Sequence, residues 1–360
     1  ERAIEQARED ADGRRKIALE IPEVEGAEQY VQQLPADLLI AGPPVLIQWD
    51  TPLGSVLLPG DVFRGSNVQG ASEVQLAIRA ADASSLPEPV RSQIGSRPMI
   101  ELQVTAGTER IDDPGVPITV VLPYTPGDEE LGDLEHIVVW RLDERGERAI
   151  PNGRYDPATG QVTFVSERPG QYAVAFVKKS FDDIADYPWA KRQIEVLASR
   201  DIINGYTPAV FGPGEYTTRA EFVTLLVRAL ELRAEASGNF EDVHPEDYYY
   251  EAVAVAKALG ITSGTGGNRF APNERISRQD MAVLAAAALR IAGVSVEADS
   301  EAELSRFADG QAVSDYAIES MAGLIKEGVL QGSGDGIRPL DPATRAEIAV
   351  VIYRLFHLKY

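Results

Sequence analysis

Three short segments place an arginine between a hydroxyl residue and an acid. They are Thr218-Arg219-Ala220-Glu221, Ser277-Arg278-Gln279-Asp280 and Thr344-Arg345-Ala346-Glu347. A hydroxyl at the N-cap with an acid three residues later forms a capping box, so each segment predicts the start of a helix. The arginine then stands at the first helical position, where a positive charge opposes the helix dipole at a cost of about 0.3 kcal/mol or more. Because the cost recurs in all three segments, we expect these arginines to face an anionic ligand or an acidic residue of a neighbouring segment.

The three segments belong to a longer repeat that fills the second half of the chain. An offset of 59 residues superimposes Phe181 on Phe240 and Trp189 on Tyr248, and the third copy follows at 67 or 68 residues. Self-similarity at such a spacing indicates stacked supersecondary units that share one core. We place the copies at residues 180–236, 237–300 and 301–360.

Each copy is predicted to consist of a helix, a loop and a second helix. The first helix has apolar residues at helical spacing, and a glycine after it suits the left-handed conformation that ends a helix. These glycines are Gly205, Gly264 and Gly332. The loop carries an apolar plug two residues before a proline, and the plugs are Phe211, Phe270 and Ile337. The alanine-rich run Met281–Ile291 in the second copy predicts a buried helix.

Residues 17–179 follow a different pattern. Short runs such as Val45–Trp49 and Ile118–Leu122 are rich in β-branched and aromatic residues and are bounded by turn residues, which is typical of strands. Several such strands predict a mainly-β domain with an antiparallel, sandwich-like arrangement. A helix is expected to interrupt it near Ser72–Ala81 or Leu86–Ile94. We interpret residues 1–16 as the tail of an upstream helix.

The composition argues against several classes of function. The net charge is -22 over 360 residues, whereas nucleic acids and anionic membrane surfaces call for a basic face. Cysteine is absent, which excludes disulfides and thiolate catalysis. No apolar run reaches the roughly 18 residues needed to span a bilayer. The chain starts at Glu1 without a Met or an apolar leader, and we interpret it as a fragment of a longer protein.

Signals of catalysis are weak. The three histidines, His136, His244 and His357, show no metal-binding spacing, and no Gly-x-Ser-x-Gly elbow occurs. The sequence therefore predicts no catalytic residue, no metal site and no cofactor. A glycosidase-like pair among the 56 acidic residues stays open as an alternative.

The repeat resembles the S-layer homology domain over residues 181–360. The shared features are an aromatic with an aspartate two residues later, an aromatic at the first helix, a loop glycine, a Phe-x-Pro motif and the Thr-Arg-Ala-Glu box. The opening motifs are Phe181-Asp182-Asp183, Phe240-Glu241-Asp242 and Phe307-Ala308-Asp309, and the helix aromatics are Trp189, Tyr248 and Tyr316. Three departures stand out: the second box is Ser-Arg-Gln-Asp, the third plug is Ile337 in place of Phe, and the loop of the third repeat is one residue shorter.

The resemblance implies an all-α unit of three helix-loop-helix repeats with pseudo-threefold symmetry around a central bundle. It further implies that grooves between repeats bind a secondary cell-wall polysaccharide linked to peptidoglycan, often through a pyruvylated amino sugar. The residues to which it gives ligand-binding roles are Arg219, Arg278, Arg345, Asp183, Asp242, Asp309, Trp189, Tyr248, Tyr316, Gly205, Gly264 and Gly332. A ketal-linked pyruvate carries a carboxylate, which agrees with the argument about the arginines. The departures predict unequal grooves, at least one of them weak or silent.

These features together predict a non-catalytic anchor that ties an exported protein to the bacterial cell wall or S-layer, outside the cell. Two alternatives stay open: a lattice subunit that mainly self-assembles with neighbouring copies, and the anchor portion of a surface hydrolase. The arginines could simply pair with acids of a neighbouring repeat, and the helix aromatics could be core residues. Residues 17–179 are similar to a β-rich region often placed before such repeats in large surface proteins, and we interpret them as a spacer.

Overall fold

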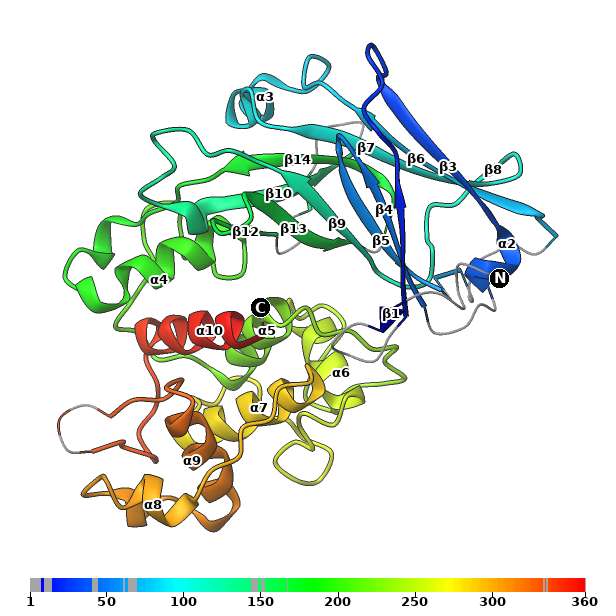
Figure 1. The fold of residues 1–360 in the computed structure, drawn as a ribbon. Coiled ribbons are helices and arrows are strands. Elements are labelled where there is room, and N and C mark those ends of the chain that lie inside the picture. Colours follow the sequence, from blue (N-terminus) through cyan, green and yellow to red (C-terminus); the bar gives the residue numbers. More distant parts are fainter. Residues whose placement is uncertain are drawn as a thin grey trace. The chain divides into compact units, whose positions relative to one another are not determined.

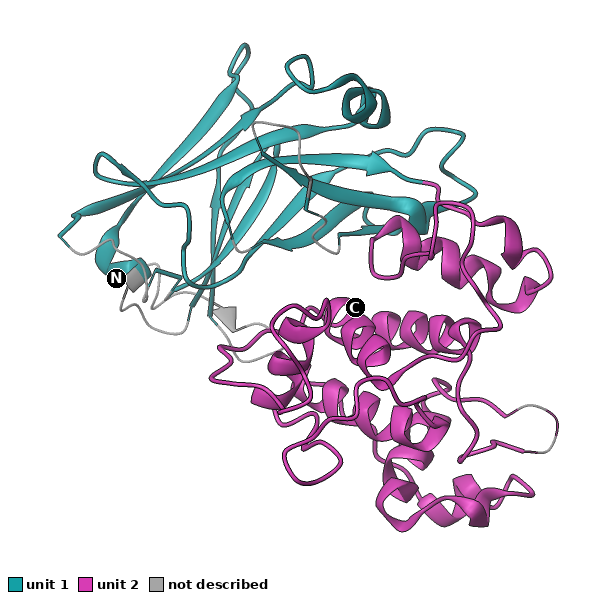
Figure 2. Cartoon of the chain, turned by 180° about the vertical axis from the view of Figure 1, so that it is seen from behind, with its two compact units in different colours: residues 1–177 teal, residues 178–360 magenta. Residues whose placement is uncertain are grey.

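The computed structural model describes residues 8–9, 15–40, 45–60, 62–63, 70–143, 148–149, 153–166, 168–332, 334 and 336–359. The chain divides into two compact units, residues 1–177 and residues 178–360 (Figure 2). The first unit is built of β-strands and the second of helices (Figure 1). This division confirms the predicted fold class of a mainly-β domain followed by an all-α domain.

The described residues of the first unit form two β-sheets. The first sheet has the order β1 (Arg8–Glu9), β2 (Arg15–Glu20), β4 (Val45–Thr51), β5 (Gly54–Pro59), β9 (Ile118–Pro123), β13 (Gln161–Ser166) and β12 (Arg154–Asp156). The second has the order β11 (Arg148–Ala149), β10 (Ile137–Leu142), β14 (Gly170–Phe176), β7 (Met99–Ala106), β6 (Glu73–Ala80) and β3 (Gln29–Pro35), with β8 (Glu109–Arg110) paired to β7. The short helices α2 (Ala36–Ile40) and η1 (Leu134–His136) lie where the chain passes between the sheets, and α3 (Glu88–Ile94) lies between β6 and β7 of the second sheet. Among the described strands, β2 and β4 pair in parallel and the other pairs are antiparallel.

Alternating side chains of the two sheets form the main core of this unit. In β4, Val45, Ile47 and Trp49 are buried and the residues between them are half-buried, as expected for a strand with one face inward. They pack in one cluster with Leu76 and Leu102 of the second sheet. The core therefore lies between the sheets, as in a sandwich.

The second sheet also buries its other face. Trp140 of β10 and Ala173 of β14 form a smaller cluster with Ile94 of α3, so α3 covers this face. Of the two places where a helix was expected, the one near Leu86–Ile94 is confirmed as α3. The one near Ser72–Ala81 is wrong, because those residues form β6, whose apolar residues have partners in β3 and β7.

The prediction of a helical tail over residues 1–16 is wrong where the structure describes those residues. Arg8–Glu9 form β1, and Arg15 and Lys16 begin β2. Residues 15–20 pair with residues 45–50 of β4, a strand about 30 positions later in the chain. The remaining residues of the predicted tail lie outside the described residues. Charged residues thus occupy a strand here because a distant partner supplies the hydrogen bonds.

The second unit contains three helix pairs. The first helices of the pairs are α4 (Pro188–Ser199), α6 (Tyr250–Ala258) and α9 (Ile318–Lys326), and the second are α5 (Arg219–Ala229), α7 (Arg278–Ile291) and α10 (Arg345–Lys359). Short elements η2 (Asp182–Ile184), α8 (Ser300–Leu304), η3 (Gly310–Ala312) and η4 (Asp315–Ala317) stand before α4 and α9. We call the second helices the box helices, because each begins at the arginine of a predicted capping box.

The three pairs are arranged with pseudo-threefold symmetry. The box helices contact one another, and each also packs against the first helix of the next pair: α5 on α6, α7 on α9 and α10 on α4. Just before the boxes, three backbone hydrogen bonds of 3.0 Å form a closed ring, from Thr217 to Ala343, from Ala343 to Ile276 and from Ile276 to Thr217. The closing contact of α10 on α4 joins the last repeat to the first, so no repeat is left with an open apolar face.

The plugs are buried as predicted, but the helix stops are not where the glycine pattern placed them. Gly205, Gly264 and Gly332 lie in the loops, several residues beyond the ends of α4, α6 and α9. The first residues with positive φ after the ends of these helices are Asp201 (53°), Gly260 (70°) and Gly328 (70°). The prediction failed because the first copy has Asp201 at the end of its helix, where the other two copies have a glycine. The glycines that end the helices therefore do not repeat in all three copies.

Candidate functional site

The three box arginines, Arg219, Arg278 and Arg345, are buried and reach from one repeat into the next. Each Nε donates to the carbonyl oxygen of a plug residue: Arg219 to Phe270 (3.1 Å), Arg278 to Ile337 (2.8 Å) and Arg345 to Phe211 (3.0 Å). The last of these bonds runs from the third repeat to the first. The arginines therefore form hydrogen bonds across all three interfaces between neighbouring repeats, and we call these interfaces the seams.

A box acid from the neighbouring repeat faces each arginine. The N–O distances are 3.9 Å from Arg219 to Asp280, 3.2 Å from Arg278 to Glu347 and 3.8 Å from Arg345 to Glu221. These acids offset the positive charge at each helix start, which explains how an arginine is tolerated there. The structural interpretation of the arginines, as partners of acids in a neighbouring repeat, is thus confirmed. Ligand contact stays a prediction, and it concerns the same seams.

The boxes differ in their capping. In the first, Thr218 accepts a bond from the Glu221 amide, and Glu221 accepts one of 2.7 Å from the Thr218 amide, so the box is complete. The third box is complete in the same way. In the second, the side chain of Asp280 is one methylene shorter and accepts a bond of 2.8 Å from the Ser277 hydroxyl. The replacement of Glu by Asp in the second box thus changes the hydrogen bonds at the start of that helix.

The predicted aspartates, Asp183, Asp242 and Asp309, hold the plug loops of their own repeats. Each carboxylate accepts two backbone N–H groups, from the plug residue and from the residue after it, at 2.7–2.9 Å. Burial by itself raises the pKa of Asp242 and Asp309, but the hydrogen bonds from the backbone amides lower it by more, so that the pKa lies below the ordinary 3.8. These aspartates therefore fix the plug loops whose carbonyl oxygens accept the hydrogen bonds of the box arginines.

This geometry predicts an acid-labile second unit. A lowered folded pKa gives stability that is complete above the unfolded value of 3.8 and is lost as the pH falls through the folded value. We expect the variant Asp242→Asn/Asp309→Asn to be less stable at pH 7 by about 1–3 kcal/mol per site. Its free energy of unfolding should also change less than that of the wild type between pH 5 and about pH 2. Urea unfolding at several pH values measures both, and equal pH dependence in the two proteins would contradict the assignment.

The loop glycines make room for aromatic side chains. A Cβ added at Gly205, Gly264 or Gly332 would lie 2.5, 2.7 and 2.6 Å from a ring carbon of Phe181, Phe240 and Phe307 respectively. No ordinary contact is that short, so only glycine fits. The glycines are therefore packing positions.

The helix aromatics are exposed. Trp189, Tyr248 and Tyr316 have 52%, 67% and 59% of their surface accessible, so none is a core residue. Tyr248 lies near Arg345 and Glu221, and Tyr316 lies near Arg219 and Asp280. Trp189 shares a pocket with Arg278, as described next. Each inter-repeat site thus combines an aromatic from one repeat, an arginine from the next, and an acid and a loop from the third.

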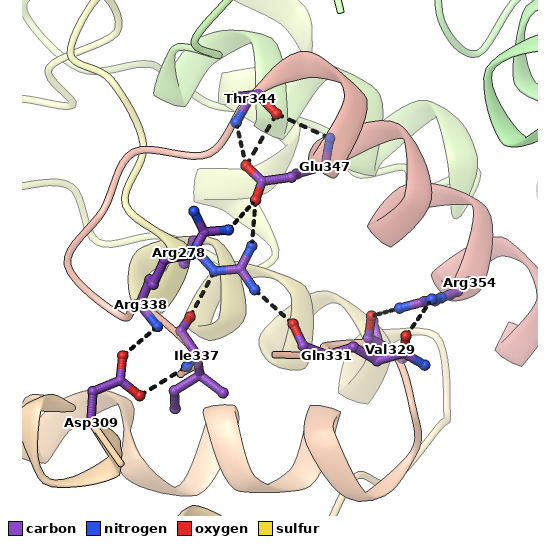
Figure 3. Close-up of polar contacts among 9 residues, drawn as sticks. All are labelled: Arg278, Asp309, Val329, Gln331, Ile337, Arg338, Thr344, Glu347 and Arg354. Atoms are coloured by element: carbon purple, nitrogen blue, oxygen red, sulfur yellow. Dashed lines mark hydrogen bonds and ion pairs between the residues drawn. The ribbon is translucent and has the colours of Figure 1, made fainter. Parts of the chain in front are cut away.

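One of these sites forms a pocket of about 410 Å³, which we call the Arg278 pocket. Its lining includes Trp189, Gly332 and Arg278 from the predicted set, and also Arg338 and Arg354. The volume falls in the range of ordinary ligand sites. Figure 3 shows that its charged groups converge from the box helix α7, the third loop and helix α10.

The polar network of the Arg278 pocket centres on Glu347. Its Oε1 accepts bonds from Arg278 (3.2 Å) and from Arg338 (2.8 Å), while its Oε2 accepts from Thr344 (Figure 3). Burial lowers the pKa of the Arg278 guanidinium, and Glu347 only partly offsets this. Burial also lowers the pKa of Arg354. The pocket therefore holds desolvated positive charge, which favours an anion.

Sequence reasoning missed Arg338 and Arg354. Arg338 follows the third plug, where the other copies have Gly212 and Ala271. Arg354 stands nine residues after its box arginine, where the second copy has Ala287. Arg338 could have been found as a charge that interrupts the internal repeat, whereas Arg354 has an arginine counterpart, Arg228, in the first copy.

Comparisons with known proteins agree with this architecture. The S-layer homology domain family matches residues 180–223, 239–282 and 306–349, which contain all twelve predicted site residues. The second unit carries three S-layer homology domains. The resemblance deduced from the sequence is thereby confirmed.

Relatives of this chain include enzymes and S-layer proteins. It is 38% identical over 205 residues to an amylopullulanase of Thermoanaerobacterium thermosulfurigenes, which is 56% of this chain and 11% of that protein. It is 31% identical over 205 residues to the surface-layer 125 kDa protein of Lysinibacillus sphaericus, covering 56% of this chain and 17% of that protein. It is 30% identical over 184 residues to an S-layer protein of Bacillus anthracis, covering 50% and 21% respectively. The chain thus spans about a fifth or less of the length of these relatives.

S-layer homology domains anchor surface proteins to the cell wall, so this unit implies a cell-surface, wall-associated location. Among the described residues, no helix is both long and apolar enough to cross a bilayer. The S-layer homology domains themselves are thus the part of the described chain that points to attachment at the surface.

Proposed function

We propose that this chain anchors an exported surface protein to the bacterial cell wall without covalent attachment. The second unit binds a secondary cell-wall polysaccharide, linked to peptidoglycan, through a pyruvylated amino sugar held between repeats. The first unit is a β-sandwich spacer, and neither unit catalyses a reaction. The chain thus works outside the cell, at the wall or S-layer, with the polysaccharide as its partner.

The observation that carries this proposal is the composition of the Arg278 pocket. A pyruvate ketal places a carboxylate on a sugar ring, and guanidinium groups are the preferred protein partners of carboxylates. Trp189, exposed at the same pocket, offers an apolar aromatic face to a sugar ring. An anionic sugar therefore matches both the charge and the surface of the site.

Calorimetric titration with a pyruvylated amino sugar tests this proposal. The matched control is the same sugar without the ketal, which presents the same ring and hydroxyl groups but no carboxylate. We expect measurable binding of the pyruvylated sugar and at least tenfold weaker binding of the control, because the lost charge-assisted bond is worth about 1.5–3 kcal/mol. Equal affinities for the two sugars, or no detectable heat of binding with either, would contradict the proposal.

A second candidate is a lattice subunit whose main role is self-assembly. The similarity to surface-layer proteins of Lysinibacillus sphaericus and Bacillus anthracis favours it. Electron microscopy of the purified chain distinguishes the two, since ordered arrays formed without wall material are expected only for a lattice subunit. The similarity to an amylopullulanase favours a variant of the first proposal, in which the anchored protein is a hydrolase.

A further inference from the structure

The three inter-repeat sites carry different charge. The lining of the Arg278 pocket contains three arginines, Arg278, Arg338 and Arg354, and a single carboxylate, that of Glu347. At the Arg219 site, the counterparts of the latter two arginines are Ala271 and Ala287. At the Arg345 site, the counterparts are Gly212 and Arg228, so the Arg278 pocket alone has arginines at both positions. Arg354 lies outside the segments that match the S-layer homology domain family.

The single carboxylate of the pocket is already shared. Oε1 of Glu347 accepts from both Arg278 and Arg338, so one negative charge faces two guanidinium groups. Asp341 and Asp309 also lie near Arg278, but neither forms an ion pair with it, and the two oxygens of Asp309 are occupied by the backbone amides of Ile337 and Arg338. The two guanidinium groups at this end of the pocket therefore share one ion-pair partner, Glu347.

Arg354 supplies a second uncompensated charge. Its guanidinium donates to the carbonyl oxygen of Val329 (2.9 Å) and to Oε1 of Gln331 (3.0 Å), which are neutral acceptors (Figure 3). No carboxylate among the described residues forms an ion pair with it. Gln331 stands between the arginines, because its backbone oxygen accepts from Arg278 at 3.0 Å and its side chain from Arg354. The two uncompensated charges thus lie on either side of Gln331.

We infer that the Arg278 pocket binds an acidic glycan end that presents two anionic groups, with Arg354 as the residue that selects for the second. This inference rests on the proposed function and makes it more specific. The first anion is the carboxylate of the terminal sugar, which binds at the end of the pocket formed by Arg278 and Arg338 and offsets the excess positive charge there. The second is a phosphate or a uronic acid carboxylate next to it. Both offer the oxygens that a guanidinium group binds, and a ligand with one anion leaves one charge unmatched.

Titration with three probes tests the inference on the whole chain. They are a pyruvylated amino sugar methyl glycoside, the same sugar as its 1-phosphate, and the same sugar linked to glucuronic acid. We expect the wild type to bind at least one of the doubly anionic probes about tenfold or more tightly than the methyl glycoside, and the probe that gains identifies the second group. In Arg354→Gln this preference should fall to less than about twofold, with the methyl glycoside bound almost as before.

Arg228→Gln is the matched control, because Arg228 occupies the position of Arg354 in the first repeat. It should keep the full preference. Equal binding of all three probes by the wild type, or an unchanged preference in Arg354→Gln, overturns the inference while leaving wall anchoring intact. Absence of binding to every probe overturns the proposed function as well.

A separate observation concerns the Arg219 site, where hydrogen bonds hold the side chain of Tyr316 in place. The Tyr316 hydroxyl donates to Oδ1 of Asp280 (2.7 Å) and accepts from Nε2 of Gln279 (2.8 Å). Oε1 of Gln279 accepts in turn from the backbone of Ser314, at 3.0 Å. Gln279 and Asp280 are two of the three departures of the second box, and the other boxes have Ala and Glu at these positions.

We infer that this latch, made of Tyr316, Gln279 and Asp280, closes the Arg219 site to sugars. The hydroxyl of the helix aromatic and the acid of the box are here bonded to each other, so the ring of Tyr316 is held in one position at the site. Partial burial of the Tyr316 hydroxyl and its bond to Asp280 raise the pKa of Tyr316 to about 12. The silent site expected from the sequence is therefore the one between the second and third repeats and Arg219.

The variant Gln279→Ala/Asp280→Glu, which restores the pair found in the other boxes, tests the latch. We expect the number of sugars bound per chain to rise by one, and Tyr316→Phe to give the same gain by another route. Spectrophotometric titration, with Tyr316→Phe as the reference, should show the pKa of Tyr316 moving from about 12 toward its ordinary value of 10.0 in the double variant. A wild type that already fills three sites, or an unchanged number in both variants, would refute the latch.

Discussion

Replacing Arg278 with alanine is expected to weaken binding to the wall polysaccharide by about a hundredfold, which corresponds to about 2.7 kcal/mol. The change removes a guanidinium from the Arg278 pocket and leaves Glu347 with Arg338 as its remaining pocket arginine. It also removes the bonds to the carbonyl oxygens of Ile337 and Gln331 that shape the wall of the pocket. Binding to purified polysaccharide, measured by calorimetry, gives the size of the loss.

Arg219→Ala is the control for this prediction, because Arg219 makes the same bond to a plug carbonyl and faces the same kind of acid. Both variants should lose about 1–3 kcal/mol of stability through the broken seam. Only Arg278→Ala should lose most of its affinity, since the Arg219 site is latched. Similar losses of affinity in both variants would show that the arginines act through the seam alone.

Replacing Gly264 with alanine is expected to destabilise the second unit by about 3 kcal/mol or more. Gly264 has a φ of +79°, and an added Cβ would lie 2.3 Å from the carbonyl oxygen of Arg269 and 2.7 Å from the ring of Phe240. The oxygen belongs to the backbone, so it cannot move aside without disturbing the plug that follows it. Urea unfolding monitored by circular dichroism measures the loss.

Gly260→Ala separates the two causes of this effect. Gly260 also has a positive φ, of +70°, but an added Cβ there meets no atom within 4 Å. Its cost should therefore be the backbone strain alone, about 1 kcal/mol. If the two alanine variants were equally stable, the close approach at Gly264 would not be what requires glycine.

The box helices could be predicted well from the sequence, because their signals are local. The hydroxyl, the arginine and the acid of each box lie within four residues, and α5, α7 and α10 begin at Arg219, Arg278 and Arg345 as expected. The plug residues were equally visible, since a large apolar residue in a polar loop has to be buried. The internal repeat then made one local prediction valid for three places.

Features that depend on contacts between distant residues were missed. The strand of Arg15–Glu20 is charged and exists because β4 pairs with it. The partner of each box arginine lies more than 50 residues away, so the closed seam and the shared Glu347 could not be deduced. Arg354 lies at the site because it bonds to Val329 and Gln331, which are more than 20 residues earlier in the chain. Its counterparts, Arg228 and Ala287, gave no common pattern to detect.

Sedimentation of the whole chain with isolated cell-wall sacculi tests the central claim most directly. The measurement is made before and after chemical removal of the secondary polysaccharide, with Arg219→Ala, Arg278→Ala and Arg345→Ala alongside. The anchor account predicts that the wild type sediments with untreated walls, stays in solution with stripped walls, and loses binding most strongly in Arg278→Ala. Equal retention on stripped and untreated walls, or on neither, would contradict it.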